Sequence, residues 1–174
     1  MGNFWNKDDK RKKVLIFSFD KDYLQQLSGA LSIEKLYIDE NKGFTKKKLI
    51  YKNLPFDAWF ILTRNKDLWL QHFLEINGII INFAFTNTGN DNKLVIDILN
   101  TIINQKSLKN IPILFLFDAN NKDEEIVDCL RKSIDNKIEK EKYKLIKFYT
   151  VDFQNNINDI QIGLDWLFTN KEFL

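Results

Sequence analysis

The chain has 174 residues, which is enough for one domain with a substantial buried core. Its 26 lysine and arginine residues nearly balance its 24 aspartate and glutamate residues, which argues against a dedicated nucleic-acid-binding protein. The single cysteine excludes a disulfide framework, and no apolar run reaches the ~18 residues that a membrane span needs.

The N-terminal segment, residues 1–12, is predicted to be a tail. Gly2 would become the N-terminal residue once the initiator methionine is removed, Phe4 and Trp5 follow, and a cluster of basic residues comes next. This pattern favours a lipid anchor on Gly2 beside a basic patch, although Asn6 stands where serine or threonine is preferred. The alternative is a tail whose Phe4 and Trp5 dock on the domain or on a partner. We expect no signal peptide, because the segment lacks an apolar core.

The next stretch is predicted to be a buried strand over residues 14–19 and a helix over residues 21–31. In nucleotide-binding folds, the turn between such a strand and helix holds phosphate. The pattern G-x-x-x-x-G-K-[ST] supplies glycines for close backbone approach, a lysine for the phosphate charge and a hydroxyl for magnesium. At these positions the chain has Ser18, Tyr23, Leu24 and Gln25. The order of strand, turn and helix is therefore retained, and the phosphate-binding groups are not.

Two short strands are predicted within residues 46–62, as an antiparallel hairpin around a turn at Asn53, Leu54 and Pro55. Four lysines lie on or beside the first strand: Lys46, Lys47, Lys48 and Lys52. We expect them to be solvated and to discourage unwanted pairing at an edge of the sheet.

Helices and strands are predicted to alternate through the rest of the chain. The hydrophobic periodicity indicates helices over residues 65–73, 91–103, 123–134 and 160–168, and apolar runs indicate strands over residues 79–83, 111–117 and 145–151. Continuous apolar strands are typical of parallel sheets that are covered on both faces. The alternation predicts an α/β fold with a doubly wound sheet in three layers.

Four motifs resemble those of the ADP-ribosylation factor (Arf) and Arf-like small GTPases, in the order that this family has them. They are the MGN start, GFTKKKLIYKNLPFDAW at residues 43–59, LWLQHF at residues 68–73 and GLDWL at residues 163–167. The second is similar without gaps to the family's interswitch hairpin, the third to its L-W-R-H-Y-F helix, and the fourth to the start of its last helix. The resemblance implies one domain over residues 13–174 with the P-loop small-GTPase fold, whose six-stranded, mostly parallel sheet has one antiparallel interswitch strand.

The chain departs from this family where the family contacts nucleotide. Asn41 stands in place of the threonine that the family's first switch supplies to magnesium. Phe60, Leu62 and Arg64 stand in place of the aspartate, glycine and glutamine of W-D-x-G-G-Q. Those three residues support the metal, sense the γ-phosphate and position the attacking water in the family.

The guanine-reading motifs are also altered. N-K-x-D faces residues 119–122 and is recovered in part only with a one-residue insertion, and the last guanine motif meets Gln154, Asn155 and Asn156. Burying triphosphate charge without lysine or metal costs several kcal/mol per uncompensated ion, whereas micromolar binding requires about −8 kcal/mol. We therefore predict no tight GTP binding, no GTPase turnover and a former nucleotide pocket filled by side chains, with Tyr23 and Phe60 as candidates.

No catalytic residue, cofactor site or metal site is predicted. His72 is the only histidine, and no cysteine, aspartate or glutamate lies at convincing ligand spacing around it. No nucleophile elbow can be assembled either.

The resemblance implies a partner-binding surface as well. The family holds effectors with a phenylalanine, a tryptophan and a tyrosine on the interswitch hairpin and the second-switch helix, and the corresponding residues here are Phe44, Trp59 and His72. Aromatic side chains are enriched at interfaces, so these three residues are candidates for partner binding. The alternative is that Phe44 and Trp59 only cap the sheet.

These observations favour a catalytically inactive pseudo-GTPase that serves as a structural subunit or adaptor in a protein assembly, with membrane association left open. We expect protein partners, no nucleic acid and no small-molecule substrate. The expected location is the cytoplasmic face of a membrane, or alternatively a mitochondrial membrane complex. Two other hypotheses remain: a divergent but working GTP switch in membrane trafficking, and an unrelated enzyme on a flavodoxin-like sheet, whose bound flavin would colour the protein yellow.

Overall fold

A computed structural model describes residues 11–18, 20–39, 42–62, 72–83, 97, 100–102, 104–105, 108, 110–118, 128, 132, 135–136, 145–153, 156–170 and 173. Its elements in chain order are β1 (Lys12–Ser18), α1 (Lys21–Ala30), β2 (Phe44–Tyr51), β3 (Leu54–Leu62), β4 (Gly78–Phe83), β5 (Ile113–Asp118), β6 (Ile146–Val151) and α5 (Ile157–Phe168). The helices predicted over residues 65–73, 91–103 and 123–134 lie wholly or mostly outside the described residues, as does the tail with Gly2, Phe4 and Trp5.

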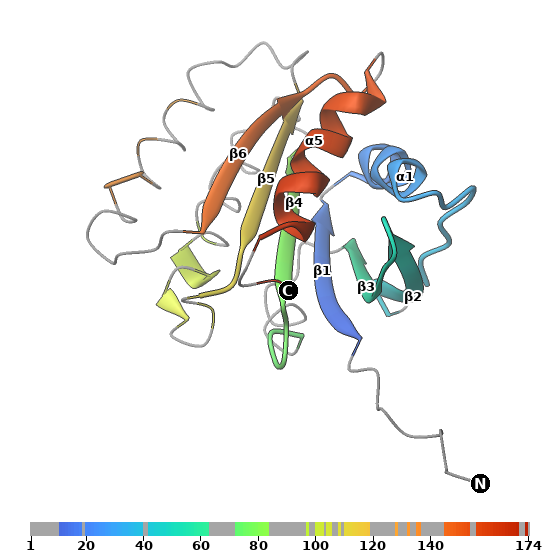
Figure 1. The fold of residues 1–174 in the computed structure, drawn as a ribbon, viewed down its shortest axis with the longest axis horizontal. Coiled ribbons are helices and arrows are strands. Elements are labelled where there is room, and N and C mark those ends of the chain that lie inside the picture. The colour runs from blue at the N-terminus through green and yellow to red at the C-terminus, as the bar shows by residue number, and fades with distance from the viewer. Residues whose placement is uncertain are drawn as a thin grey trace, which may run out of the picture.

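The six strands form one sheet in the order β2-β3-β1-β4-β5-β6. β2 pairs antiparallel with β3, and every other neighbouring pair is parallel. Helices α1 and α5 lie on the same side of this sheet (Figure 1). The predicted fold class, a mostly parallel six-stranded sheet with one antiparallel strand, is confirmed.

The two faces of the sheet bury two separate hydrophobic cores. Alternate side chains of β1 divide between them: Val14 and Ile16 join the core beneath α1 and α5, whereas Leu15 and Phe17 join the core on the opposite face. Successive side chains of a strand point to opposite faces, so a strand that is covered on both sides must be apolar throughout. This explains the uninterrupted apolar runs in β1, β4 and β5.

The hairpin turn differs from the prediction. It consists of Lys52 and Asn53 alone, with φ angles of 46° and 72°, whereas Leu54 and Pro55 belong to β3 and pair with Tyr51 and Ile50. Asparagine tolerates the left-handed conformation that a two-residue hairpin turn needs. Pro55 was misread as a turn residue because proline usually interrupts a strand.

Other boundaries move by a few residues. α1 ends at Ala30 instead of residue 31, and β5 begins at Ile113 instead of residue 111. α5 begins at Ile157, three residues before the predicted start, because the side chain of Asn156 accepts a hydrogen bond from the Asn158 amide and caps the helix.

A polar clamp joins the hairpin to α5. The Tyr51 hydroxyl donates to Asp165 Oδ1 at 2.8 Å, and Lys52 Nζ lies 2.6 and 2.7 Å from the two carboxylate oxygens of Asp165. The Tyr51 ring also stacks on Phe168, with 4.8 Å between ring centroids. The turn is therefore held against the last helix by both charge and apolar contact.

The clamp predicts a specific acid sensitivity. The hydrogen bond from Lys52, assisted by that from Tyr51, lowers the pKa of the Asp165 carboxyl despite its partial burial. A carboxyl whose pKa is lower in the folded chain stabilises the fold above its ordinary pKa of about 4, and that contribution is lost as pH falls through the folded value. The Asp165→Asn variant should therefore be less stable than wild type at pH 7 and lose less stability below pH ~4. Urea unfolding across this pH range checks both points, and parallel losses in the two proteins would contradict them.

Candidate functional site

The carboxyl ends of the parallel strands are where an α/β sheet of this kind binds its ligand. Here β1 ends at Ser18 and α1 begins at Lys21, so only two residues connect them. Three of the positions that a phosphate-binding loop would use, residues 21–23, already belong to the helix. The connection between β1 and α1 therefore differs in length from that of the phosphate-loop pattern.

The start of α1 is capped by a carboxylate of the chain itself. Asp20 has extended backbone angles, and its Oδ1 accepts hydrogen bonds from the amides of Asp22 at 2.7 Å and Tyr23 at 3.2 Å. In phosphate-binding loops the first amides of the helix, with the positive end of its dipole, hold the anion. In this chain those amides already hold one.

Ser18 holds the same turn closed from the other side. Its side chain is buried, its Oγ donates to the Asp20 carbonyl at 2.8 Å, and it accepts from the Asp20 amide at 3.3 Å. Ser18 stands where the pattern needs its first glycine, and its hydroxyl forms hydrogen bonds with the backbone of Asp20 in the turn.

Tyr23 spans the carboxyl ends of several strands. Its hydroxyl donates to the Asp118 carboxylate at the end of β5, and its ring meets Phe153, just after β6, edge-on at 5.0 Å. Its carbonyl accepts from Asn82 Nδ2 of β4 at 3.2 Å. Burial, followed by the Asp118 hydrogen bond, raises the pKa of the Tyr23 hydroxyl. Tyr23 ties α1 to β4, β5 and the segment after β6.

The next two motif positions are also engaged in the fold. Leu24 is fully buried in the core beneath α1 and α5. Gln25 Oε1 accepts from the Leu36 amide at 3.0 Å, and its Nε2 donates to the Glu34 carbonyl at 3.4 Å. Leu24, at the lysine position of the pattern, is therefore a core residue. Gln25, at the magnesium-ligand position, forms hydrogen bonds with the backbone of the segment after α1.

The remaining motif positions give a mixed result. Phe60 was a candidate to fill the nucleotide pocket. It is instead a core residue, because its position on β3 faces the core beneath α1. Its partner in the strand register is Ile16, two residues before β1 ends. Leu62 packs against the same core. Asn41, Arg64 and the segments at 119–123 and 154–155 lie outside the described residues.

Three of the five candidate partner-binding residues lie together, and the other two, Phe4 and Trp5, lie outside the described residues. The rings of Phe44 and Trp59 stack at 5.6 Å, and the His72 ring lies 4.8 Å from Phe44 and 5.1 Å from Trp59. All three side chains are half-buried, and Phe44 and Trp59 also touch the core on the face opposite α1. We call Phe44, Trp59 and His72 the aromatic patch; it caps the sheet and still reaches the surface.

Two lysines flank this patch. Lys13 Nζ lies 4.8 Å and Lys46 Nζ 5.3 Å from the Trp59 ring centroid, both within the range of cation–π attraction. Lys13 Nζ also donates to the carbonyls of His72 and Leu74, each at 3.0 Å. Burial, and then the charge of Lys13, lowers the pKa of the His72 imidazole.

The carboxylate beside the patch is already paired. Asp57 Oδ1 lies 3.1 Å from Arg11 Nε, and its Oδ2 lies 2.7 Å from Lys46 Nζ. Sequence reasoning missed these flanking charges, although strand alternation would place Asp57 and Trp59 on one face of β3. Lys13 could not have been found this way, because its contact with the patch depends on the pairing of β1 with β3.

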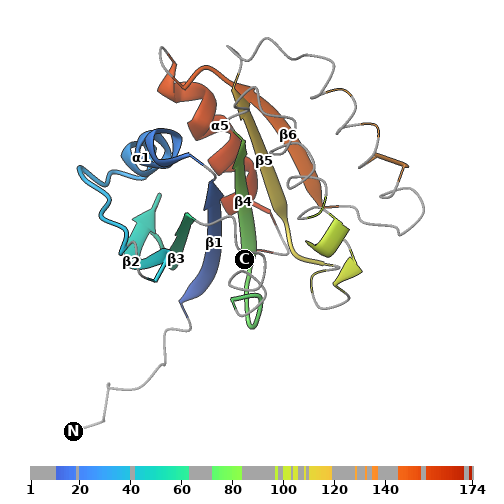
Figure 2. The ribbon, with the colours of Figure 1, turned by 180° about the vertical axis from the view of Figure 1, so that it is seen from behind.

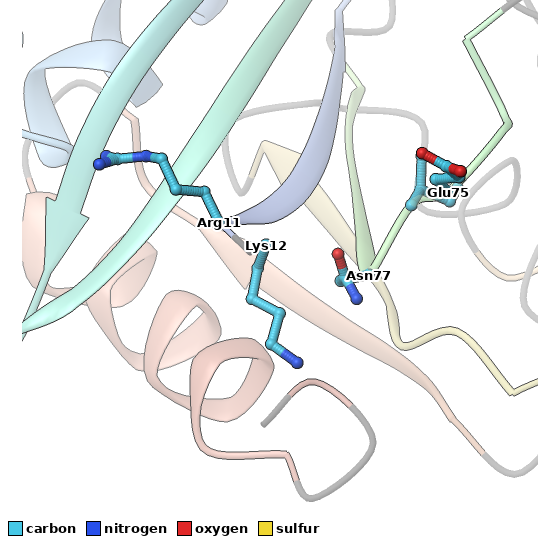
Figure 3. A pocket seen from close by; sticks show the side chains of 5 residues that line it. Arg11, Lys12, Glu75 and Asn77 are labelled. Atoms are coloured by element: carbon cyan, nitrogen blue, oxygen red, sulfur yellow. The ribbon is translucent and has the colours of Figure 1, made fainter. Parts of the chain in front are cut away.

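A cavity of about 500 Å³ opens at the other end of the strands, beside the starts of β1 and β4. It is lined by Arg11, Lys12, Glu75, Ile76 and Asn77. In Figure 3 the Arg11 side chain turns away toward the hairpin, in keeping with its ion pair to Asp57. Among the described residues, Glu75 is the one carboxylate that lines the cavity, and no three histidine, cysteine, aspartate or glutamate residues gather to hold a metal ion.

Comparison with known proteins supports the fold. No protein-family model matches the chain, and no curated protein matches its sequence. Among solved structures, the chain is similar to the Arl6 (BBS3) small GTPase of Trypanosoma brucei, determined with the bound nucleotide analogue GppNp. The TM-score is 0.67 over 90% of this chain and 95% of that one, at 11% sequence identity. The chain therefore has the fold of an Arf-like small GTPase. No helix within the described residues combines the length and the hydropathy of a transmembrane span.

Proposed function

We propose, from the premise of this small-GTPase fold, that the protein is a pseudo-GTPase that acts as a structural subunit or adaptor in a protein assembly. The observation that carries the proposal is the Asp20 carboxylate on the first amides of α1. The fold supplies its own anion at the place where a nucleotide-binding relative would hold phosphate.

Electrostatics oppose a nucleotide at this place. A phosphate near the start of α1 would face the Asp20 carboxylate, and like charges 4 Å apart repel by about 4 kcal/mol at an effective dielectric constant of about 20. Leu24 provides no cation to offset this repulsion, and Gln25 uses its amide within the fold. Micromolar affinity requires about −8 kcal/mol of net binding free energy. Asp20, Leu24 and Gln25 supply no attraction to phosphate that would contribute to it.

The aromatic patch supports partner binding. Phe44, Trp59 and His72 are held in place by mutual contact and by Lys13, so little side-chain freedom is lost when a partner covers them. Tryptophan, the central residue of the patch, is among the residue types that contribute most to the binding energy of interfaces. Attachment of the assembly to the cytoplasmic face of a membrane, through Gly2 and the basic tail, belongs to the same proposal.

Titration with a fluorescent GTP analogue tests the loss of nucleotide binding. Wild-type protein, refolded without nucleotide, should give no saturable binding at micromolar concentration, with or without magnesium. A sub-micromolar dissociation constant that depends on magnesium would overturn the proposal in favour of a working GTP switch.

The Asp20→Ala variant extends this experiment. Loss of the cap should lower stability by about 1 kcal/mol, measured by urea unfolding. It should not create nucleotide binding, because the residues at the lysine and magnesium positions are unchanged. If the variant gains magnesium-dependent affinity for the analogue, the rest of the site is intact and the proposal fails.

A further inference from the structure

The outer edge of β2 is the feature that the proposed function leaves unexplained. β2 is the first strand of the sheet, and Figures 1 and 2 show it at the margin beyond β3. The loop residue Asp39 pairs with Phe44 at the start of this edge. Among the described residues, no further strand pairs with β2.

The hydrogen-bond pattern identifies which backbone groups face outward. The two-residue turn brings Tyr51 opposite Leu54 as a hydrogen-bonded pair, and at the other end of the hairpin the Leu62 amide donates to the Gly43 carbonyl at 3.0 Å. Bonded and non-bonded pairs alternate along an antiparallel ladder. The amides and carbonyls of Lys46, Lys48 and Ile50 therefore point away from β3, toward the open edge.

The side chains along this edge are strongly basic. Lys46, Lys47 and Lys48 are consecutive and exposed, and Ile50 is 69% exposed. Lys46 pairs with Asp57, whereas Lys47 and Lys48 have no acidic partner among the described residues. Because successive side chains alternate between faces, a strand added here would meet lysines on both of its faces.

The edge is continuous with the aromatic patch. Phe44, Lys46, Lys48 and Ile50 share one face of β2, and Lys46 lies opposite Trp59 in the pairing register. A segment lying along the edge would therefore place its side chains next to the patch. The edge supplies backbone hydrogen bonds, and the patch supplies apolar contact.

We propose that β2 binds an extended, acidic segment of a partner protein, which adds to the sheet as a further strand. The proposal rests on the proposed adaptor function and specifies its partner. Charge selects the occupant: a second copy of this chain would bring lysine against lysine, and like charges directly opposite each other destabilise strand pairing. An acidic strand would be attracted to these lysines instead of repelled, and it would form hydrogen bonds with the same backbone groups of β2.

The test uses a short synthetic peptide of alternating glutamate and valine, a matched peptide of lysine and valine, and fluorescence anisotropy. The acidic peptide should bind wild-type protein and the basic peptide should not. Lys48→Pro removes an outward amide that takes no part in the pairing with β3, and should weaken binding about tenfold. Lys48→Ala removes only an exposed charge and should weaken binding about twofold.

Amide chemical shifts provide a measurement that does not depend on any variant. In wild-type protein, the peptide should shift the amide signals of Lys46, Lys48 and Ile50 more than those of Lys47 and Leu49, which bond to β3. Equal binding of both peptides, or unchanged binding by a folded Lys48→Pro protein, would overturn the proposal. So would a result in which the lysines bind vesicles containing phosphatidylserine while the acidic peptide does not bind. If these peptide experiments fail, the result of the nucleotide titration still stands, and the proposed adaptor function is not contradicted.

Discussion

Replacing Leu24 with lysine should destabilise the protein severely and should not create nucleotide binding. Leu24 is fully buried in a core that also contains Phe60 and Phe168. Removing a buried leucine side chain costs 2–5 kcal/mol, and a lysine at this place must bury an unpaired ammonium group or displace the helix. We expect a loss of about 3–5 kcal/mol, which is a large part of the 5–15 kcal/mol that stabilises a typical domain. Urea unfolding followed by circular dichroism measures this loss.

A conservative substitution at the same position is the control. Leu24→Met keeps the side-chain volume and should cost less than about 1.5 kcal/mol. A Leu24→Lys protein that is as stable as the methionine variant and binds a GTP analogue would contradict the account. It would mean that the position still faces a phosphate site.

Replacing Trp59 with alanine should abolish most partner binding. Trp59 is at the centre of the aromatic patch, in contact with Phe44, His72 and two lysines. Truncation of a central tryptophan at an interface costs at least about 2 kcal/mol, or about thirtyfold in affinity. Quantitative mass spectrometry of proteins co-purified from the source cells should show the partners depleted to that extent.

Ile162 supplies a matched control for this experiment. It is an exposed apolar residue on α5, 55% accessible to solvent, and it is not part of the patch. Ile162→Ala should leave the co-purified proteins unchanged. If Trp59→Ala retains the same partners at the same abundance while remaining folded, the aromatic patch serves only to cap the sheet.

Much of the fold could be predicted because burial on two faces leaves a direct trace in sequence. β1, β4 and β5 are apolar throughout because their side chains enter the cores on both faces of the sheet. α1 and α5 show helical spacing of apolar residues because each packs on one core with one face. The hairpin turn was mislocated because Asn53 and Pro55 carry similar turn signals, and only the pairing of Pro55 with Ile50 decides between them.

The candidate site was less predictable, because its interactions join distant segments. The contact of Tyr23 with Asp118 links residues 95 apart in sequence, and no local pattern indicates it. The cap by Asp20 was within reach of sequence reasoning, since aspartate before a helix is a strong capping signal. The aromatic patch was found only through the resemblance to a family, which brought together two residues of a hairpin and one from beyond it.

The nucleotide content of gently purified, folded protein tests the central claim most directly. The protein is unfolded, and any guanine nucleotide released is quantified by chromatography against the amount of chain. The account predicts a well-folded protein that releases no nucleotide. Release of one guanine nucleotide per chain, together with a divalent ion, would show that the turn between β1 and α1 still holds phosphate and would contradict it.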